Sequence, residues 1–239
     1  MSEAERHVSP KRGLEAFSRL VIACRRCPRL VRHRERVARE KVLRYRDWDY
    51  WGRPIPGFGD PSSRLLVVGL APAAHGGNRT GRIFTGDRSG DFLYRALYRA
   101  GFANQPTSTH RDDGLSLTDC YITAAVRCAP PDNKPTLPEI RRCRPFLFEE
   151  LALLTHVRVI VALGQIAFRA FLEALEAHGV RPSTPRPRFT HGQVILLHDG
   201  RTLIASYHPS QQNTQTGRLS DTMFQRIFRT ARRLLDADS

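Results

Sequence analysis

Four of the five cysteines stand where they could hold a metal ion or a metal cluster. Cys24 and Cys27 form a C-x2-C pair followed by proline, and Cys128 and Cys143 bracket a loop and the start of a predicted helix. Thiolates bind both Zn²⁺ and iron–sulfur clusters, so the spacing alone leaves zinc, a 4Fe–4S cluster and no metal as open alternatives. Cys120 begins a predicted strand, where we expect it to be a small buried residue.

Two loops carry polar side chains that could bind a flat or charged ligand. The segment GLAPAAHGGNRTGR at 69–82 combines four glycines with two arginines, which suits close approach to a phosphate or a base. Its spacing matches neither the nucleotide phosphate loop nor the dinucleotide fingerprint, which argues against nucleotide hydrolysis. The segment 207–218 places His208 beside several amides, where a neutral histidine can donate a hydrogen bond or act as acid or base. A purely structural role is the alternative for His208 and for His75.

The loops must be positioned by the strands and helices around them, and the sequence there alternates short apolar runs with helical patterns. Strands are expected near Leu66, Ile122, Val159, Ile195 and Ile204. Helices are expected over 91–99, 137–155, 165–178 and 221–235, with Thr136 and Glu139 forming a capping box. Alternating strands and helices predict parallel pairing through right-handed crossovers, hence an α/β fold, a three-layer α/β/α sandwich around a central mainly parallel sheet of four to five strands. Ligands in such sheets bind beyond the carboxyl ends of the strands, where both loops and the segment 127–135 lie.

Length and composition predict one domain over residues 1–239, with the basic, aromatic residues 1–60 forming an N-terminal arm on the body. No apolar run approaches the roughly 18 residues that span a membrane, and the first residues lack the apolar centre of a signal peptide. We therefore expect a soluble, cytoplasmic protein without a membrane partner. In the reducing cytosol, five cysteines favour metal binding or catalysis over disulfides.

The chain is strongly basic, which favours a polyanionic partner. Lys and Arg outnumber Asp and Glu by 38 to 23, giving a formal net charge of +15. Such a charge raises the local concentration of nucleic acid. General solubility, or a generally basic proteome, is the alternative explanation.

Three segments together resemble family 5 of the uracil-DNA glycosylase superfamily, the type b enzymes. The family's first motif resembles residues 69–82 continued by Ile83-Phe84-Thr85-Gly86-Asp87, and its later motif resembles His208-Pro209-Ser210 with residues 211–214. The cluster cysteines of families 4 and 5 coincide with Cys24, Cys27, Cys128 and Cys143. The resemblance covers roughly residues 15–235. It implies the glycosylase fold and a 4Fe–4S cluster on those four cysteines.

Departures from the superfamily pattern bear on mechanism and base choice. Leu70 and Ala71 stand where relatives commonly place a polar or acidic residue that acts on water, so another group must serve. The resemblance points to Asp87, supported by Asn133 and His208, as the catalytic residues. Ala124 replaces a base-reading asparagine of family 4, and loss of that amide relaxes base choice. The resemblance implies removal of uracil, hypoxanthine and ethenocytosine from double-stranded DNA.

The expected reaction begins when the damaged nucleotide flips out of the duplex into a pocket. We expect Phe84 to stack on the base, His208 and backbone groups near Leu70 to hydrogen-bond its oxygens, and Asp87 to stabilise the sugar cation. The expected base pocket comprises Gly69, Leu70, Ala71, Ala73, Phe84 and Ala124. The expected DNA contacts are His75, Asn78, Arg82, Ser210, Gln211, Asn213 and Arg218.

Several of these residues have simpler alternative roles. Phe84 suits core packing, Asp87 a helix cap or an ion pair with arginine, and Asn133 a turn. Arg218 suits a surface salt bridge. The cluster itself is expected to be structural, tying the arm to the body and presenting the basic residues of the arm to the DNA backbone.

Two other functions remain open from the sequence. One is a non-catalytic metal-containing nucleic-acid-binding protein, and the other is a related enzyme that acts on single strands or RNA. The motifs place no lysine as a Schiff-base nucleophile, so we expect a monofunctional glycosylase that leaves the abasic strand intact. We expect it to act as a monomer, associated with the nucleoid.

Overall fold

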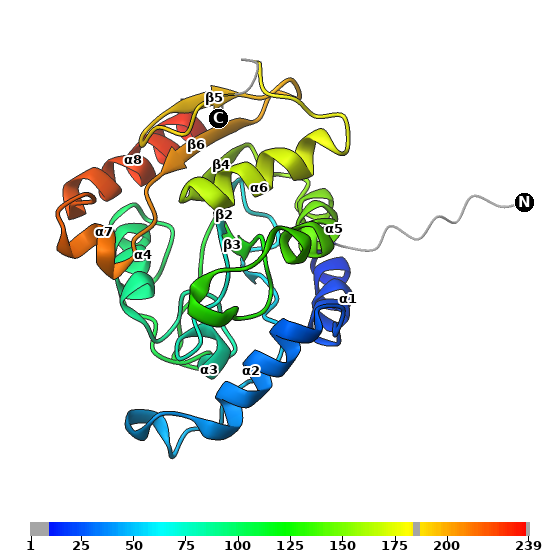
Figure 1. Cartoon of the computed structure of the whole chain (residues 1–239). Helices are drawn as coiled ribbons and strands as arrows, with labels where there is room; N and C mark the ends of the chain where they lie inside the picture. The colour runs from blue at the N-terminus through cyan, green and yellow to red at the C-terminus, as the bar shows by residue number, and fades with distance from the viewer. Residues whose placement is uncertain (1–9, 184–186, 238–239) are drawn as a thin grey trace, which may run out of the picture.

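The computed structural model describes residues 10–183 and 187–237 (Figure 1). Within them lies a six-stranded sheet with the order β1-β3-β2-β4-β6-β5. The inner strands are mutually parallel: β3 (Cys120–Ala124), β2 (Leu65–Gly69), β4 (Val159–Leu163) and β6 (Thr202–Ser206). The edge strands β1 (Phe58–Gly59) and β5 (Val194–Leu196) pair antiparallel to their neighbours. Residues of β2, β3 and β4 are all buried, as expected for parallel strands covered on both faces.

Helices cover both faces of the sheet. On one face lie α4 (Arg88–Arg99) and α8 (Asp221–Ala237), and on the other α5 (Leu137–Leu153) and α6 (Gln165–Glu176). The alternation along β2 fits this arrangement, because Leu65 and Val67 join the apolar cluster of α4 and α8, whereas Leu66 and Val68 join that of α5 and α6. The predicted three-layer sandwich is confirmed, and β1 adds a sixth strand that is too short to show as an apolar run.

The remaining elements lie at the edge of this sandwich or in its loops. Helix α1 (Pro10–Ile22) packs on α5, and α2 (Pro28–Glu40) contacts α3 (Gly77–Thr80). The short elements are η1 (Leu43–Tyr45), η2 (Pro131–Asn133) and α7 (Gln211–Gln215). The division into arm and body stays a prediction, and residues 1–9 of the arm lie outside the described residues. In the described residues, no helix has the length and apolarity needed to span a bilayer.

Caps define where two of the predicted helices begin. Helix α4 starts at Arg88, three residues before the predicted start, because Asp87 caps it. Helix α5 starts at Leu137 as predicted, and the Glu139 carboxylate accepts a hydrogen bond from the Thr136 backbone N–H at 2.7 Å. The capping-box prediction is confirmed.

A buried ion pair fastens the loop after β3 to helix α5. The Arg127 Nη2 atom lies 2.6 Å from Glu150 Oε2, and both side chains are almost completely buried. The Tyr121 hydroxyl donates to Glu150 Oε1 at 3.3 Å, and the Thr123 hydroxyl donates to Oε2. These partners satisfy the carboxylate, which offsets the cost of burying its charge.

Replacing Glu150 by glutamine should strongly destabilise the fold. The change keeps the shape of the side chain but leaves the Arg127 charge buried without a counterion, which costs about 3–5 kcal/mol of unfolding free energy. Urea unfolding followed by circular dichroism measures it, and Glu149→Gln on the exposed side of the same helix should stay within about 0.5 kcal/mol of wild type. Equal stabilities of the two variants would show that the pair does not hold this loop.

Candidate active site

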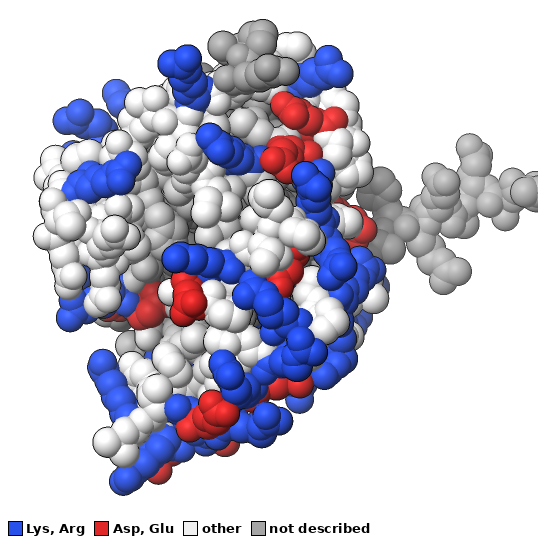
Figure 2. Space-filling view, in the orientation of Figure 1, with Lys and Arg blue, Asp and Glu red and all other residues white. Residues whose placement is uncertain are grey.

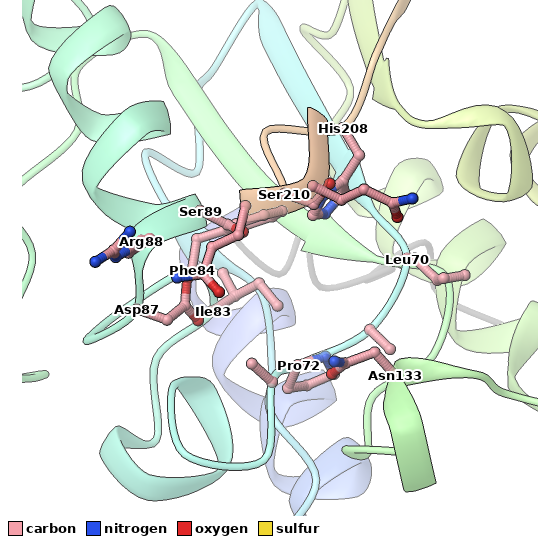
Figure 3. A pocket seen from close by; sticks show the side chains of 14 residues that line it. Leu70, Pro72, Ile83, Phe84, Asp87, Arg88, Ser89, Asn133, His208 and Ser210 are labelled. Atoms are coloured by element: carbon pink, nitrogen blue, oxygen red, sulfur yellow. The ribbon is translucent and has the colours of Figure 1, made fainter. Parts of the chain in front are cut away.

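A cavity of about 470 Å³ opens beyond the carboxyl ends of β2, β3 and β6 (Figure 3). Its walls come from three loops that are far apart in the sequence. The loop after β2 contributes Leu70, Ala71, Pro72, Ala73, Ile83, Phe84 and Asp87, continued by Arg88 and Ser89 at the start of α4. The turn η2 contributes Asn133, and the loop after β6 contributes His208, Ser210, Gln211 and Gln212. The three residues predicted to be catalytic therefore line one cavity.

Phe84 forms one wall of the cavity, and a glycine makes room for its ring. A β-carbon on Gly69 would lie 2.7 Å from Phe84 Cε2, closer than any side chain tolerates. Ala124, the register partner of Gly69, is also small and is 2% exposed. Phe84 itself is 6% exposed and belongs to the apolar core. Its side chain therefore both packs in the core and lines the cavity.

His208 follows β6 and reaches the cavity as a neutral group. Its ring centroid lies 5.9 Å from that of Phe84. Burial lowers the pKa of His208 to about 4, so the imidazole is uncharged at neutral pH and can donate a hydrogen bond. The Asn213 amide donates to the His208 carbonyl at 2.8 Å, and Ser210 caps α7. Asn213 thus holds the histidine loop from within, whereas Gln211 beside it is exposed.

Asp87 is a helix cap whose side chain also lines the cavity. Its Oδ1 atom accepts a hydrogen bond from the Gly90 N–H at 2.9 Å, so the capping alternative is confirmed. Burial raises the pKa of Asp87, while the backbone N–H groups of the first turn oppose that rise. Gly76 lies against the other oxygen, since a β-carbon there would approach Oδ2 to 2.1 Å.

Asn133 lies at the rim of the cavity. It is exposed, and both it and Asp132 adopt left-handed backbone conformations, with φ of 56° and 53°. Asn133 therefore belongs to a tight turn, as the alternative had it, and the turn brings its amide to the cavity.

Two of the predicted DNA contacts are buried, and the prediction is wrong for them. Asn78 is 1% exposed, and Arg82 is 3% exposed. The Arg82 guanidinium donates to both carboxylate oxygens of Asp113 and to Ser108, while the Asn78 amide donates to the Arg34 carbonyl at 3.2 Å. These side chains hold the glycine-rich loop in place, which leaves neither of them a surface for DNA.

The three other predicted DNA contacts outside the cavity, Asn213 among them, are at least partly accessible. His75 is half-buried, and its Nδ1 atom lies 3.0 Å from the Tyr50 hydroxyl. Arg218 is exposed and lies over the Tyr207 ring, with 4.8 Å from its guanidinium carbon to the ring centroid. No carboxylate in the described part of the chain pairs with Arg218, which removes the salt-bridge alternative there.

The structure adds Arg79, which the sequence analysis missed. Its guanidinium lies between the rings of Tyr45 and Trp48, 3.9 and 4.0 Å from their centroids. It also donates to the carbonyls of His75 and Gly86, at 2.7 and 2.9 Å. Arg79 therefore joins the aromatic segment 45–51 to both ends of the loop that leads to Asp87. The density of aromatic residues in that segment was the available signal.

The four candidate ligand cysteines line one small cavity of about 20 Å³. Arg34 Nη1 donates to Cys128 Sγ at 2.9 Å, and the Arg127 N–H donates to Cys143 Sγ at 3.4 Å. Burial raises the pKa of the Cys128 thiol to about 11 and that of Cys143 to about 12. Among residues 10–183 and 187–237, no three or more His, Cys, Asp or Glu side chains form an arrangement that could hold a metal ion. Cys120 lies in the core at 0% exposure, as predicted.

The His208 ring should titrate far below an ordinary histidine. NMR spectra of the ring, assigned through a His208→Asn variant, should show a neutral imidazole from pH 8 down to about 5. Since the folded pKa lies below the ordinary histidine pKa of 6.5, the unfolded chain binds more protons between these two pH values, and stability falls as the pH drops through that window. A midpoint near 6.5 would instead indicate a solvated ring.

Comparisons with known proteins agree with this geometry. The model of the Uracil DNA glycosylase superfamily matches residues 56–232. The Type-5 uracil-DNA glycosylase of Thermus thermophilus is 56% identical over 221 residues, covering 92% of this chain and 97% of that protein. The Type-5 enzyme of Mycobacterium tuberculosis is 54% identical, covering 90% and 79%. That of Pyrobaculum aerophilum is 46% identical, covering 93% and 94%. The chain therefore belongs to the uracil-DNA glycosylase superfamily, and within it to the type-5 group.

Proposed function

We propose that this protein removes uracil and other deaminated or damaged bases from double-stranded DNA by hydrolysing the N-glycosidic bond. One observation carries the proposal: a cavity walled by an aromatic ring holds both a neutral imidazole and a carboxylate. A base inside a duplex is inaccessible, so the nucleotide must rotate out into such a cavity. The net charge of +15 supports attraction to the DNA backbone.

The catalytic roles follow from the chemistry of the side chains. Phe84 stacks on the base, and neutral His208 donates a hydrogen bond to a base oxygen as negative charge develops there. The bond between the sugar C1′ and the base nitrogen breaks, and its electron pair leaves with the base. The Asp87 carboxylate stabilises the positive charge on the sugar, and water adds to C1′ to give the abasic site. Asn133, at the rim, supports the bound nucleotide.

The cavity walls favour broad base specificity. Leu70, Ala71 and Ala73 present no side-chain donor or acceptor to the base. Strong discrimination requires polar groups that the wrong base leaves unpaired, so hypoxanthine and ethenocytosine are accepted as well as uracil. Mispaired bases cost less to flip, which favours U·G pairs. No lysine lines the cavity in the described part of the chain, which supports a monofunctional enzyme.

We also propose a 4Fe–4S cluster on Cys24, Cys27, Cys128 and Cys143. The donor types support the proposal, because four thiols are the usual ligands of such a cluster, and here they line one small cavity in which two of their sulfurs accept N–H hydrogen bonds. When bound, the cluster would supply four sulfur–iron bonds that join the arm to the loop after β3 and to helix α5. The Arg34 guanidinium and the Arg127 amide stabilise the thiolates.

We further propose that the protein acts as a monomer. Because the proposed substrate is genomic DNA, we place the protein in the cytoplasm, associated with the nucleoid.

Base release tests the proposed reaction. Wild type should free uracil, hypoxanthine and ethenocytosine from duplexes without cutting the strand, and prefer duplexes to single strands. His208→Ala and Asp87→Asn should each lower kcat for uracil roughly 100- to 1,000-fold, because each removes a charge-stabilising group. The exposed controls His198→Ala and Asp236→Asn should keep wild-type rates. No release by wild type would favour the non-catalytic nucleic-acid-binding protein, and near-normal rates in both site variants would contradict the assigned roles.

Metal analysis tests the cluster. Protein purified without oxygen should contain about four iron and four sulfide ions per chain, and Cys128→Ala should lose them. Cys120→Ala is the matched control, because Cys120 lies in the core away from the other four. About one zinc per chain, with no sulfide, would contradict the cluster.

A further inference from the structure

We propose that the outer face of helix α2 binds the phosphates of the DNA strand that carries the flipped nucleotide. The proposal rests on the proposed function, since it takes DNA as the ligand. Arg32, Arg36 and Arg39 line an open groove of about 410 Å³ on this face, and Pro131 of turn η2 lines it too. Figure 2 shows basic side chains along the lower edge of the molecule, where Figure 1 places α2.

The three arginines share one face of the helix and are available to a ligand. Their spacing of four and three residues aligns them along α2, and all three are exposed. Within the described ranges, Arg32 and Arg39 form no salt bridge, and Arg39 acts on the Glu35 carboxylate only at longer range. Arg36 reaches Glu40 at 3.8 Å, with the two side chains 57% and 67% exposed, and such a surface pair contributes little.

The acidic residue of the groove, Glu35, already has an arginine partner. Glu35 accepts two hydrogen bonds from Arg25, at 2.5 and 3.2 Å. The groove therefore keeps a net positive charge. The pKa of His33 in the same groove is lowered by burial and then by Arg36 and Arg29, which agrees with a positive local potential.

The opposite face of α2 holds the helix rigidly against the body. Leu30 and Val31 are buried there. Arg34 is 2% exposed, donates to Cys128 Sγ and to the Cys24 carbonyl, and offers its own carbonyl to Asn78. The outer arginines are thus presented from a fixed support, which lowers the entropy cost of binding.

One turn connects the groove with the cavity. Pro131 and Asn133 both belong to η2, and Pro131 lines the groove whereas Asn133 lines the cavity. A helix rises 1.5 Å per residue, so Arg32 to Arg39 spans about 10.5 Å. Each strand carries one phosphate per about 3.4 Å of duplex axis, so this length, laid along the axis, covers roughly three phosphates. A strand that delivers a nucleotide to the cavity can therefore continue along α2, where guanidinium groups form paired hydrogen bonds with phosphate.

The salt dependence of DNA binding tests this surface. The variant Arg32→Gln/Arg36→Gln/Arg39→Gln is compared with the control variant Arg226→Gln/Arg229→Gln/Arg233→Gln. The control removes the same amount of charge from three exposed arginines of α8, on another side of the molecule. Binding of an undamaged duplex is measured from about 50 to 200 mM salt. The α2 variant should flatten the slope of log K against log salt by about 2 to 3, since each phosphate contact contributes about 0.9. The α8 variant should change it by less than about 1.

Kinetics separate this inference from the proposed reaction. On a U·G duplex the α2 variant should raise KM about tenfold or more and keep kcat within about twofold, because these arginines touch phosphate and not the base. Equal slopes for the two triple variants overturn the surface, even if wild type releases uracil. If only the α2 variant lowers the salt dependence of binding and wild type releases no base, the α2 surface is supported and the proposed glycosylase activity is contradicted. Thermal melting controls for folding, and the single variant Arg32→Gln, with about 0.9 less slope, replaces the triple variant if it melts early.

Discussion

The buried pair of Arg127 and Glu150 connects the cavity with the cysteine site. Arg127 stands between Val126, whose N–H bonds the Leu70 carbonyl, and Cys128, one of the four clustered cysteines. The same loop runs on to Asn133 at the cavity rim. One buried ion pair thus fixes the position of a loop that lines both the cavity and the cysteine site. A shift of this loop would move both together, because the same short segment lines the cavity and carries Cys128.

Arginines hold the other segments of the site in a similar way. Arg82 joins the glycine-rich loop to Asp113, Arg79 joins it to the aromatic segment 45–51, and Arg34 joins α2 to Cys128. A planar guanidinium with five donors can serve several carbonyl, sulfur and carboxylate acceptors at once, which lysine cannot. The high arginine content therefore has two uses. Part of the +15 charge faces outward as on α2, and part is consumed inside as the framework of the loops.

The fold was predictable because its signals are local. Buried parallel strands read as continuous apolar runs, and Thr136 with Glu139 marks the start of a helix. Parallel pairing then places the loops that carry His208 and Asp87 at one edge of the sheet. The strand β1 escaped prediction, since two residues show no periodicity. The wrong prediction for Arg82 has another cause, because its partner Asp113 lies 31 residues away in the sequence. No local sequence pattern distinguishes a buried arginine that pairs with a carboxylate from an exposed arginine that can bind phosphate. The stacking of Arg79 on Tyr45 is nonlocal in the same sense.

Burial shifts the pKa values of the two ionisable groups of the cavity in opposite directions. The proposed chemistry suits the shift at His208 but requires the shift at Asp87 to be opposed. Burial keeps His208 neutral, and a neutral imidazole still has one N–H that can donate to a developing oxyanion. The same loss of water raises the pKa of Asp87, which has to be ionised to stabilise a cationic sugar. The N-terminus of α4 opposes this rise, because the Gly90 N–H and the helix dipole favour the charged carboxylate. Capping a helix is therefore compatible with the role proposed for Asp87 at the sugar, because the cap favours the ionised carboxylate that this role requires.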